Sequence, residues 1–114
     1  MIDVDVLVLT YKRPGLLADT LDSLARQRLP ADHRMTVIVV DNDAGQSAQA
    51  TVSRYQAVFA DIRYVCETEA NVAKARNRAL AEARARYAAF IDDDEVASPE
   101  WLATLLRARE QYRA

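Results

Sequence analysis

Residues 87–95 read Tyr-Ala-Ala-Phe-Ile-Asp-Asp-Asp-Glu, an apolar run that ends abruptly in four acidic residues. Because the run does not alternate between polar and apolar residues, it predicts a β-strand buried on both faces of a sheet. Unpaired charges are too costly to bury, so we expect the four carboxylates to lie where the strand leaves the sheet. That end of a parallel strand is where α/β proteins bind their ligands.

The four acids also predict a metal site. Crowded carboxylates repel one another unless a cation lies among them, and a divalent ion suits oxygen ligands. In an extended backbone Asp92 and Asp94 point the same way, whereas Asp93 points the opposite way. The alternative, which this stretch leaves open, is a solvated acidic turn that precedes a helix.

Length and composition are typical of one globular domain. The chain has 114 residues, 51% hydrophobic and 28% charged, so we expect residues 1–114 to form a single domain. The net charge of −2 comes from interspersed acids and bases, which argues against a nucleic-acid partner. The lone cysteine, Cys66, excludes an internal disulfide and is expected in the core. Neither a signal peptide nor an apolar run of membrane-spanning length is found.

Strand-like and helix-like patterns alternate along the chain. Apolar, β-branched runs predict strands at 4–10, 36–40 and 62–66, and residues 87–91 supply the fourth. Apolar residues at helical spacing follow each strand. This alternation implies an α/β fold, a parallel four-stranded Rossmann-like sheet with alternating helices on both faces. Each predicted strand ends in polar residues, and in a parallel sheet these ends meet at one edge.

The sequence also predicts features of the second helix, the last helix and one loop. The second helix is expected to carry Val52, Tyr55 and Phe59 on one face, and the last to begin at Ser98-Pro99, a capping serine followed by a first-turn proline. His33 falls in a predicted loop, where we expect it to be solvated.

Arg76 is the cation whose place is most informative. On the predicted third helix it lies four residues after Val72 and four before Leu80, on a stripe that we expect to face the core. A guanidinium there needs a carboxylate or phosphate partner. We expect it either to pair structurally with Asp41 or Asp92 or to bind an anion.

Two other strand ends carry groups suited to a nucleotide. Thr10, Tyr11 and Arg13 offer a hydroxyl, a ring and a cation, which suit stacking on a nucleobase and contact with an anion. Asp41 could bind a base or sugar, or form only a turn. The sequence has no dinucleotide glycine motif, phosphate loop, nucleophile elbow or Cys/His zinc cluster.

Together these stretches resemble the nucleotide-binding half of inverting family 2 glycosyltransferases, which have the GT-A fold. The resemblance spans residues 4 to 106, and its four stretches occur in the family's order and spacing. They are Val-Leu-Val-Leu-Thr-Tyr-Lys-Arg-Pro at 6–14, Val-Ile-Val-Val-Asp-Asn-Asp at 37–43, Asn-Val-Ala-Lys-Ala-Arg-Asn-Arg-Ala at 71–79 and Phe-Ile-Asp-Asp-Asp-Glu at 90–95.

The resemblance implies a donor site for a nucleoside-diphosphate sugar, with Mn²⁺ or Mg²⁺ as cofactor. It implies transfer of the sugar to an acceptor hydroxyl. The implied site residues are Thr10, Tyr11, Arg13 and Asp41 around the nucleobase, Arg76 on the nucleotide, Asp92 on the ribose, Asp93 beside it, and Asp94 on the metal.

Two departures from the family pattern bear on activity. Ala73 stands in a stretch where many members carry glycines, which puts backbone contacts to the phosphates in question. Family enzymes continue into an acceptor-binding half that supplies a general base. No candidate base occurs here, because Glu95 adjoins the metal motif and is poorly placed. Activity of the isolated chain is therefore an open question.

Three functions are compatible with these observations to different degrees. The first is a glycosyltransferase donor domain. The second is a module that binds a nucleotide or nucleotide sugar without catalysis. The third is a receiver-like signalling domain, which the Thr10-Tyr11 end of the first strand and the missing fifth strand argue against. Sugar transfer or donor hydrolysis by the isolated chain would separate the first two.

The expected partners follow from the same reasoning. The sequence does not identify the acceptor. The resemblance implies a cytoplasmic protein that acts at the inner face of the membrane. We also expect the fourth strand to lie at an open sheet edge, and unpaired edges favour self-association into a homo-oligomer.

Overall fold

The computed structural model describes residues 2–111 and has the α/β architecture that the sequence predicts. Its parallel strands alternate with helices along the chain. The strands are β1 (Ile2–Thr10), β2 (His33–Asp41), β3 (Ile62–Cys66) and β4 (Tyr87–Asp92), and the helices are α1 (Pro14–Ala25), α2 (Gln49–Arg54), α3 (Val72–Glu82) and α4 (Trp101–Gln111).

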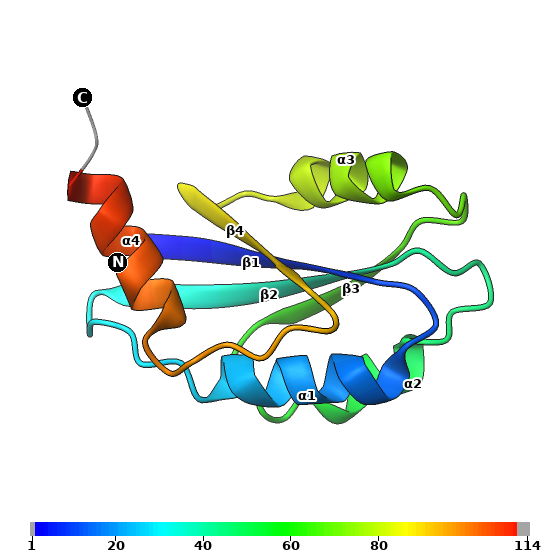
Figure 1. Ribbon diagram of the computed structural model, residues 1–114, viewed down its shortest axis with the longest axis horizontal. Helices are drawn as coiled ribbons and strands as arrows, with labels where there is room; N and C mark the ends of the chain where they lie inside the picture. The colour runs from blue at the N-terminus through cyan, green and yellow to red at the C-terminus, as the bar shows by residue number, and fades with distance from the viewer. Residues whose placement is uncertain (1, 112–114) are drawn as a thin grey trace.

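The order of the strands places a ligand crevice between β1 and β4. The order is β3-β2-β1-β4, so the chain moves outward from β1 to β3 and then returns to the other side of β1. α3 makes this return on one face, and α1 and α2 cover the other (Figure 1). The direction of winding therefore reverses between β1 and β4. Open α/β sheets bind ligands beyond the carboxyl ends of the two strands at such a point.

Each face of the sheet has its own apolar layer. Val6 of β1 packs with Leu21 of α1 on one face. On the other face Leu7 packs with Ala75 and Ala79 of α3. β1 is thus buried on both faces, as a central parallel strand should be.

β4 is an edge strand, so the prediction of two buried faces is wrong for it. Ile91 is buried, whereas Ala88 is exposed and Phe90 is half-buried. Small alanines are tolerated at exposed positions, which is why the unbroken apolar run did not reveal the exposed side. Within residues 2–111, β4 pairs only with β1. The prediction that the fourth strand lies at an open edge is confirmed.

Two local predictions are also wrong. His33 begins β2, because that strand extends beyond its β-branched run, and its side chain is 9% exposed with the ring 2.8 Å from Asp32 Oδ1. α2 ends at Arg54, so Tyr55 and Phe59 lie beyond the helix, although both pack against the core.

The start of α4 differs slightly from the prediction. The helix begins at Trp101, whose backbone N–H donates to the Ser98 carbonyl at 3.0 Å. Ser98 therefore opens a turn that leads into the helix instead of capping its first residue.

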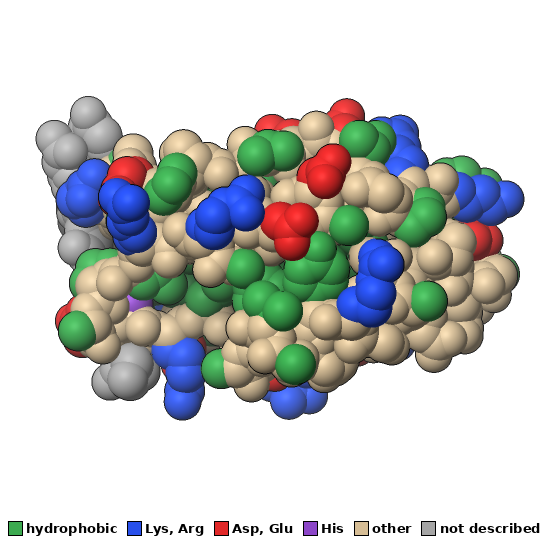
Figure 2. Space-filling model, turned by 90° about the horizontal axis from the view of Figure 1, so that it is seen from below, with side chains coloured by type: hydrophobic (Ala, Val, Ile, Leu, Met, Phe, Trp, Pro, Cys, Tyr) green, Lys and Arg blue, Asp and Glu red, His purple; other side chains and the backbone are tan. Residues whose placement is uncertain are grey.

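The surface over α1 and α2 carries charges of both signs. Figure 2 views this face and shows basic and acidic side chains around a central group of hydrophobic ones. Every helix within residues 2–111 falls short of the length and apolar character that crossing a bilayer demands.

Candidate functional site

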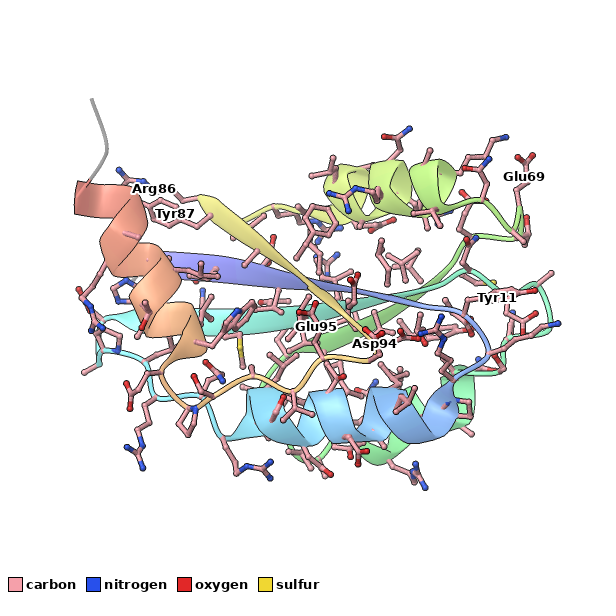
Figure 3. The ribbon with its side chains drawn as sticks, in the orientation of Figure 1. Tyr11, Glu69, Arg86, Tyr87, Asp94 and Glu95 are labelled. Atoms are coloured by element: carbon pink, nitrogen blue, oxygen red, sulfur yellow. The ribbon has the colours of Figure 1, made fainter. Side chains whose placement is uncertain are left out.

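A pocket of 240 Å³ opens at the carboxyl ends of β1 and β4, beside the start of α3. This is the point at which the strand order reverses. Figure 3 shows Asp94 and Glu95 at the end of β4 and Tyr11 in the loop after β1. All predicted site residues except Asp41 and Arg76 line the pocket, together with three apolar side chains: Leu9, Thr10, Tyr11, Arg13, Val72, Ala75, Asp92, Asp93 and Asp94.

Asp93 connects the ends of the two strands from inside the protein. Its residue is 6% exposed. Oδ2 accepts hydrogen bonds from Thr10 Oγ1 at 2.9 Å and the Tyr11 backbone N–H at 3.4 Å, and Oδ1 lies 3.6 Å from Arg13 Nη1. The expectation that all four acids lie outside the core is therefore wrong for Asp93. A buried carboxylate is tolerated here because it has two donors and a cation.

Asp92 and Asp94 have the opposite environment. Both are exposed while Asp93 is buried, which matches the predicted alternation, although residues 93 and 94 form a turn beyond the end of β4. The Asp94 carboxylate lies 3.7 Å from Arg13 Nη1. The Asp92 backbone N–H donates to Glu95 Oε1 at 2.9 Å, which occupies the Glu95 carboxylate within the turn. Asp92 and Asp94 thus line the same pocket, and the Arg13 guanidinium lies within reach of both the exposed Asp94 and the buried Asp93.

Arg76 lies on the outer face of α3, contrary to prediction. Val72 is 70% exposed and Leu80 is 53% exposed, because the helix packs on the sheet through its alanines. The guanidinium carbon of Arg76 lies 4.5 Å from the centroid of the Phe90 ring, a cation–π contact. Phe90 and Asp92 project from the same face of β4. Arg76 is therefore on the same side of the sheet as Asp92, but within residues 2–111 it forms no ion pair with Asp92 or Asp41.

Asp41 organises the loop after β2. It is fully buried and accepts hydrogen bonds from the backbone N–H groups of Asp43 (3.2 Å) and Ala48 (2.9 Å) and from the Tyr64 hydroxyl (2.7 Å). Burial, followed by this hydrogen bond to Asp41, raises the pKa of Tyr64. The Asp41 carboxylate therefore holds the turn after β2 through these backbone hydrogen bonds, in line with the second of the two roles expected for it. Tyr64 was not found from sequence, since nothing in the chain order pairs it with Asp41.

Asn42 is a second polar residue that sequence reasoning underrated. Its Nδ2 donates to the carbonyls of Glu67 (3.1 Å) and Glu69 (2.6 Å), and its Oδ1 accepts from the Asn71 N–H at 3.0 Å. Asn71 in turn caps α3 by accepting from the Lys74 N–H at 3.1 Å. The buried Asn42 thus fixes where α3 begins, and α3 forms one wall of the pocket.

The loop between β1 and α1 is held in an uncommon conformation beside the pocket. Lys12 has a φ of 53°, in the left-handed region that a lysine rarely adopts. Its ammonium lies 5.3 Å from the centroid of the Tyr11 ring. The hydrogen bond from the Gly45 N–H, 3.0 Å from Asp43 Oδ1, lowers the pKa of the nearby Asp43, and the charge of Lys12 adds to this effect. Such strain is typical of functional loops.

The donor set fits a divalent ion only in part. No group of three His, Cys, Asp or Glu side chains within residues 2–111 is placed to hold a metal. Asp92 and Asp94 could supply two hard oxygen ligands. Mg²⁺ and similar ions are commonly held by one or two carboxylates plus substrate phosphates, so these residues suit an ion that arrives with a diphosphate.

A larger hollow of 620 Å³ lies at the opposite end of the sheet, beside the amino-terminal ends of the strands. Its charges are largely paired within the protein: Arg34 Nε lies 2.9 Å from Asp3 Oδ1, and Thr36 Oγ1 lies 3.1 Å from Asp61 Oδ2. Because ligands of parallel sheets bind at the carboxyl ends of strands, we assign the site to the smaller pocket.

The chain is similar to known proteins in sequence and in fold. Residues 5–114 match the sequence model for Glycosyl transferase family 2. The chain is 46% identical over 105 residues to the succinoglycan biosynthesis protein ExoM of Rhizobium meliloti, a match that covers 90% of this chain and 33% of that protein.

Solved structures share the fold. The crystal structure of S. aureus TarS in complex with UDP-GlcNAc superposes with a TM-score of 0.83 at 26% identity, covering 97% of this chain and 32% of that chain. The mannosyltransferase PcManGT of Pyrobaculum calidifontis, in complex with GDP-Man and Mn²⁺, gives a TM-score of 0.82 at 28% identity over 93% of this chain and 32% of that chain. The chain therefore spans about a third of the length of these relatives.

Proposed function

This chain belongs to glycosyl transferase family 2, and we propose that it binds a nucleoside-diphosphate sugar with Mn²⁺ or Mg²⁺ at the β1–β4 pocket, for transfer of the sugar to an acceptor hydroxyl. Its fold is similar to that of proteins solved with nucleotide sugars.

The observation that carries the proposal is the separation of the three aspartates. Asp93 is held inside by Thr10 and Arg13, whereas Asp92 and Asp94 remain exposed at one pocket. Two exposed carboxylates at one pocket, next to a cation, suit a ligand that brings both positive and negative charge. A metal–diphosphate complex has this character.

The roles of the chain's own residues follow from their positions. Tyr11, 46% exposed at the pocket, would stack on the nucleobase, and Asp92 would accept from a ribose hydroxyl. Asp94 would ligate the ion, and Arg13, now 3.7 Å from Asp94, would turn toward the diphosphate. When bound, the ion would stabilise negative charge on the departing diphosphate.

Asp41 and Arg76 take less direct roles in this proposal. Asp41 shapes the loop that borders the base, because its carboxylate is already satisfied. Arg76 would leave the Phe90 ring to reach a phosphate, or contribute its charge from there.

A second candidate is a module that binds the donor without catalysis. It is favoured by the Glu95 carboxylate, which is bonded to the Asp92 N–H and so is a poor general base. Incubation of the isolated chain with UDP-glucose and Mn²⁺ separates the two candidates. Release of glucose or its transfer supports the enzyme, and binding without turnover supports the module.

We also propose a localisation, an acceptor class and a mode of self-association. We infer a cytoplasmic protein that works at the inner membrane face on an acceptor bearing a hydroxyl group. We infer self-association through the outer edge of β4, which pairs only with β1 among the described strands.

Isothermal titration calorimetry with UDP and GDP, with and without Mn²⁺, tests donor binding. We expect heat of binding only when Mn²⁺ is present, and its loss in Asp94→Asn. Equal binding by both proteins under both conditions would exclude the proposed metal-dependent site.

A further inference from the structure

We propose that Thr20 of α1 is a positioning residue that sets the direction of the acidic turn after β4. This inference rests on the proposed donor site. No side chain of α1 lines the pocket. The Thr20 hydroxyl contacts the backbone of the acidic turn and not its carboxylates.

The turn extends beyond the hydrogen-bond ladder of the sheet. β4 pairs with β1 as far as Asp92, which is opposite Leu9. Within the turn, the Glu95 N–H donates to the Asp92 carbonyl at 3.1 Å. Asp94 is therefore not held by strand pairing, and its direction depends on what holds the turn from outside.

Thr20 supplies that support. Its residue is fully buried, and its Oγ1 lies 3.0 Å from the Asp93 carbonyl and 2.6 Å from the Glu95 carbonyl. One hydroxyl thus contacts the backbone on both sides of Asp94. The hydroxyl has a single hydrogen, so the two contacts share it as a bifurcated hydrogen bond. It restrains the 93–94 peptide, which directly precedes the proposed metal ligand, and the 95–96 peptide, which lies one residue beyond it.

The contact continues along α1. Ser23, one turn later, accepts from the Ala97 N–H at 3.0 Å. Gln27, which follows the end of α1 at Ala25, donates to the Ser98 carbonyl at 2.6 Å and accepts from the Leu102 N–H at 3.0 Å. Thr20 and Ser23 fall on one face of α1 by their spacing. These three residues bind residues 93–102 to α1 and to its C-terminal end, and Thr20 is the member nearest the pocket.

The arrangement links both ends of the site to a single helix. Asp93 is held by its side chain to Thr10 and by its carbonyl to Thr20. α1 starts at Pro14, directly after the loop that carries Tyr11 and Arg13. A shift of α1 would therefore move the loop and the acidic turn together. Outer partners of this type typically change metal affinity by about 10- to 100-fold when they are removed.

The test compares Thr20→Val, which has nearly the same shape without the hydroxyl, with Thr20→Ser, which retains it. Thr51→Val is the matched control, because Thr51 of α2 is also a buried helical threonine and does not line the pocket. Mn²⁺ electron paramagnetic resonance in the presence of UDP measures the bound ion, and amide hydrogen exchange of residues 92–97 measures the order of the turn without ligand.

We expect Thr20→Val to weaken Mn²⁺ binding roughly tenfold or more and to speed exchange in residues 92–97, while Thr20→Ser and Thr51→Val stay near the wild type. Ser23→Ala, which should speed exchange mainly around Ala97, provides a second variant if valine is not accommodated. Unchanged Mn²⁺ affinity and exchange in Thr20→Val would overturn the positioning role alone. Absence of Mn²⁺–UDP binding in the wild type would instead overturn the donor site.

Discussion

At the scale of single residues, neighbouring aspartates have different tasks because their environments differ. Asp93 is 6% exposed and bonded to Thr10, whereas the Asp94 side chain is 54% exposed. The period of two predicted that Asp92 and Asp94 share an environment, although residues 93 and 94 form a turn beyond the strand. It did not predict that the third would be buried, because the partners Thr10 and Arg13 come from the opposite end of the chain.

Substitution of these two aspartates by asparagine should give opposite results. Asp93→Asn weakens a buried acceptor of two donors and a cation, and should lower the free energy of unfolding by about 1–3 kcal/mol. Asp94→Asn should change it by no more than about 0.5 kcal/mol while abolishing metal-dependent nucleotide binding. Urea unfolding and calorimetry on both variants check this pair. Equal stability losses would contradict the distinction between them.

At the scale of elements, strand positions were predicted well and the orientation of α3 was not. The β-branched runs gave strands close to β1, β2 and β3. On α3, the sequence pattern grouped bulky and small apolar residues into one stripe. The structure buries only the small ones, Ala75 and Ala79, and leaves Val72 and Leu80 exposed. Hydrophobicity alone cannot indicate that a helix lies too close to its sheet for larger side chains.

This packing predicts that enlarging a small residue harms stability more than truncating a large one. Ala79→Leu inserts atoms against Leu7 and Ile38 and should cost about 1–3 kcal/mol. Leu80→Ala, on the exposed face, should stay within about 0.5 kcal/mol of the wild type. Chemical denaturation of both variants measures these effects. A larger loss for Leu80→Ala would mean that α3 faces the sheet with its other side.

The contact between α1 and Tyr55, the residue after α2, should make the free energy of unfolding fall at alkaline pH. The Tyr55 hydroxyl lies 3.0 Å from the Ala18 carbonyl and 2.7 Å from Asp22 Oδ1. Burial, and then the hydrogen bond to Asp22, raise the pKa of Tyr55 from 10.0 to about 12. The folded chain therefore keeps this proton to higher pH than the unfolded chain, and the free energy of unfolding should fall as pH rises through this window.

Tyr55→Phe should reduce the steepness of that fall, since the residue no longer titrates. Tyr87→Phe is a suitable control, because no hydrogen bond between its hydroxyl and α1 or α2 occurs among the described residues. Urea unfolding at intervals across the window gives the slopes. A slope unchanged by Tyr55→Phe but reduced by Tyr87→Phe would contradict this assignment.

At the scale of the whole molecule, the reversal of strand order brings distant stretches to one pocket. Thr10 and Asp93 are 83 residues apart in sequence and within hydrogen-bond distance in space. Alternating elements and polar strand ends predicted which edge of the sheet would carry the site. The division between residues that line the pocket and residues that support it, such as Thr20, Asp41 and Asn42, depends on side-chain contacts across elements. The chain order does not encode these contacts visibly.

The open edge of β4 should make the chain self-associate. Unpaired strand edges pair with other strands, and a lysine on an edge strand opposes such pairing. Sedimentation velocity should show mass rising toward a dimer with concentration for the wild type, and less so for Ala88→Lys, at an exposed position of β4. A monomer at every concentration, or equal association of both proteins, would contradict pairing through this edge.

A metal–nucleotide complex bound between the carboxyl ends of β1 and β4 should broaden the amide signals around it, and nuclear magnetic resonance with Mn²⁺ and UDP measures this paramagnetic effect. The strongest broadening should fall at residues 10–13, 72–75 and 92–95, around the 240 Å³ pocket. Broadening centred on Asp3, Arg34, Arg63 and Arg84, which line the 620 Å³ hollow at the amino-terminal ends of the strands, would overturn the proposed site.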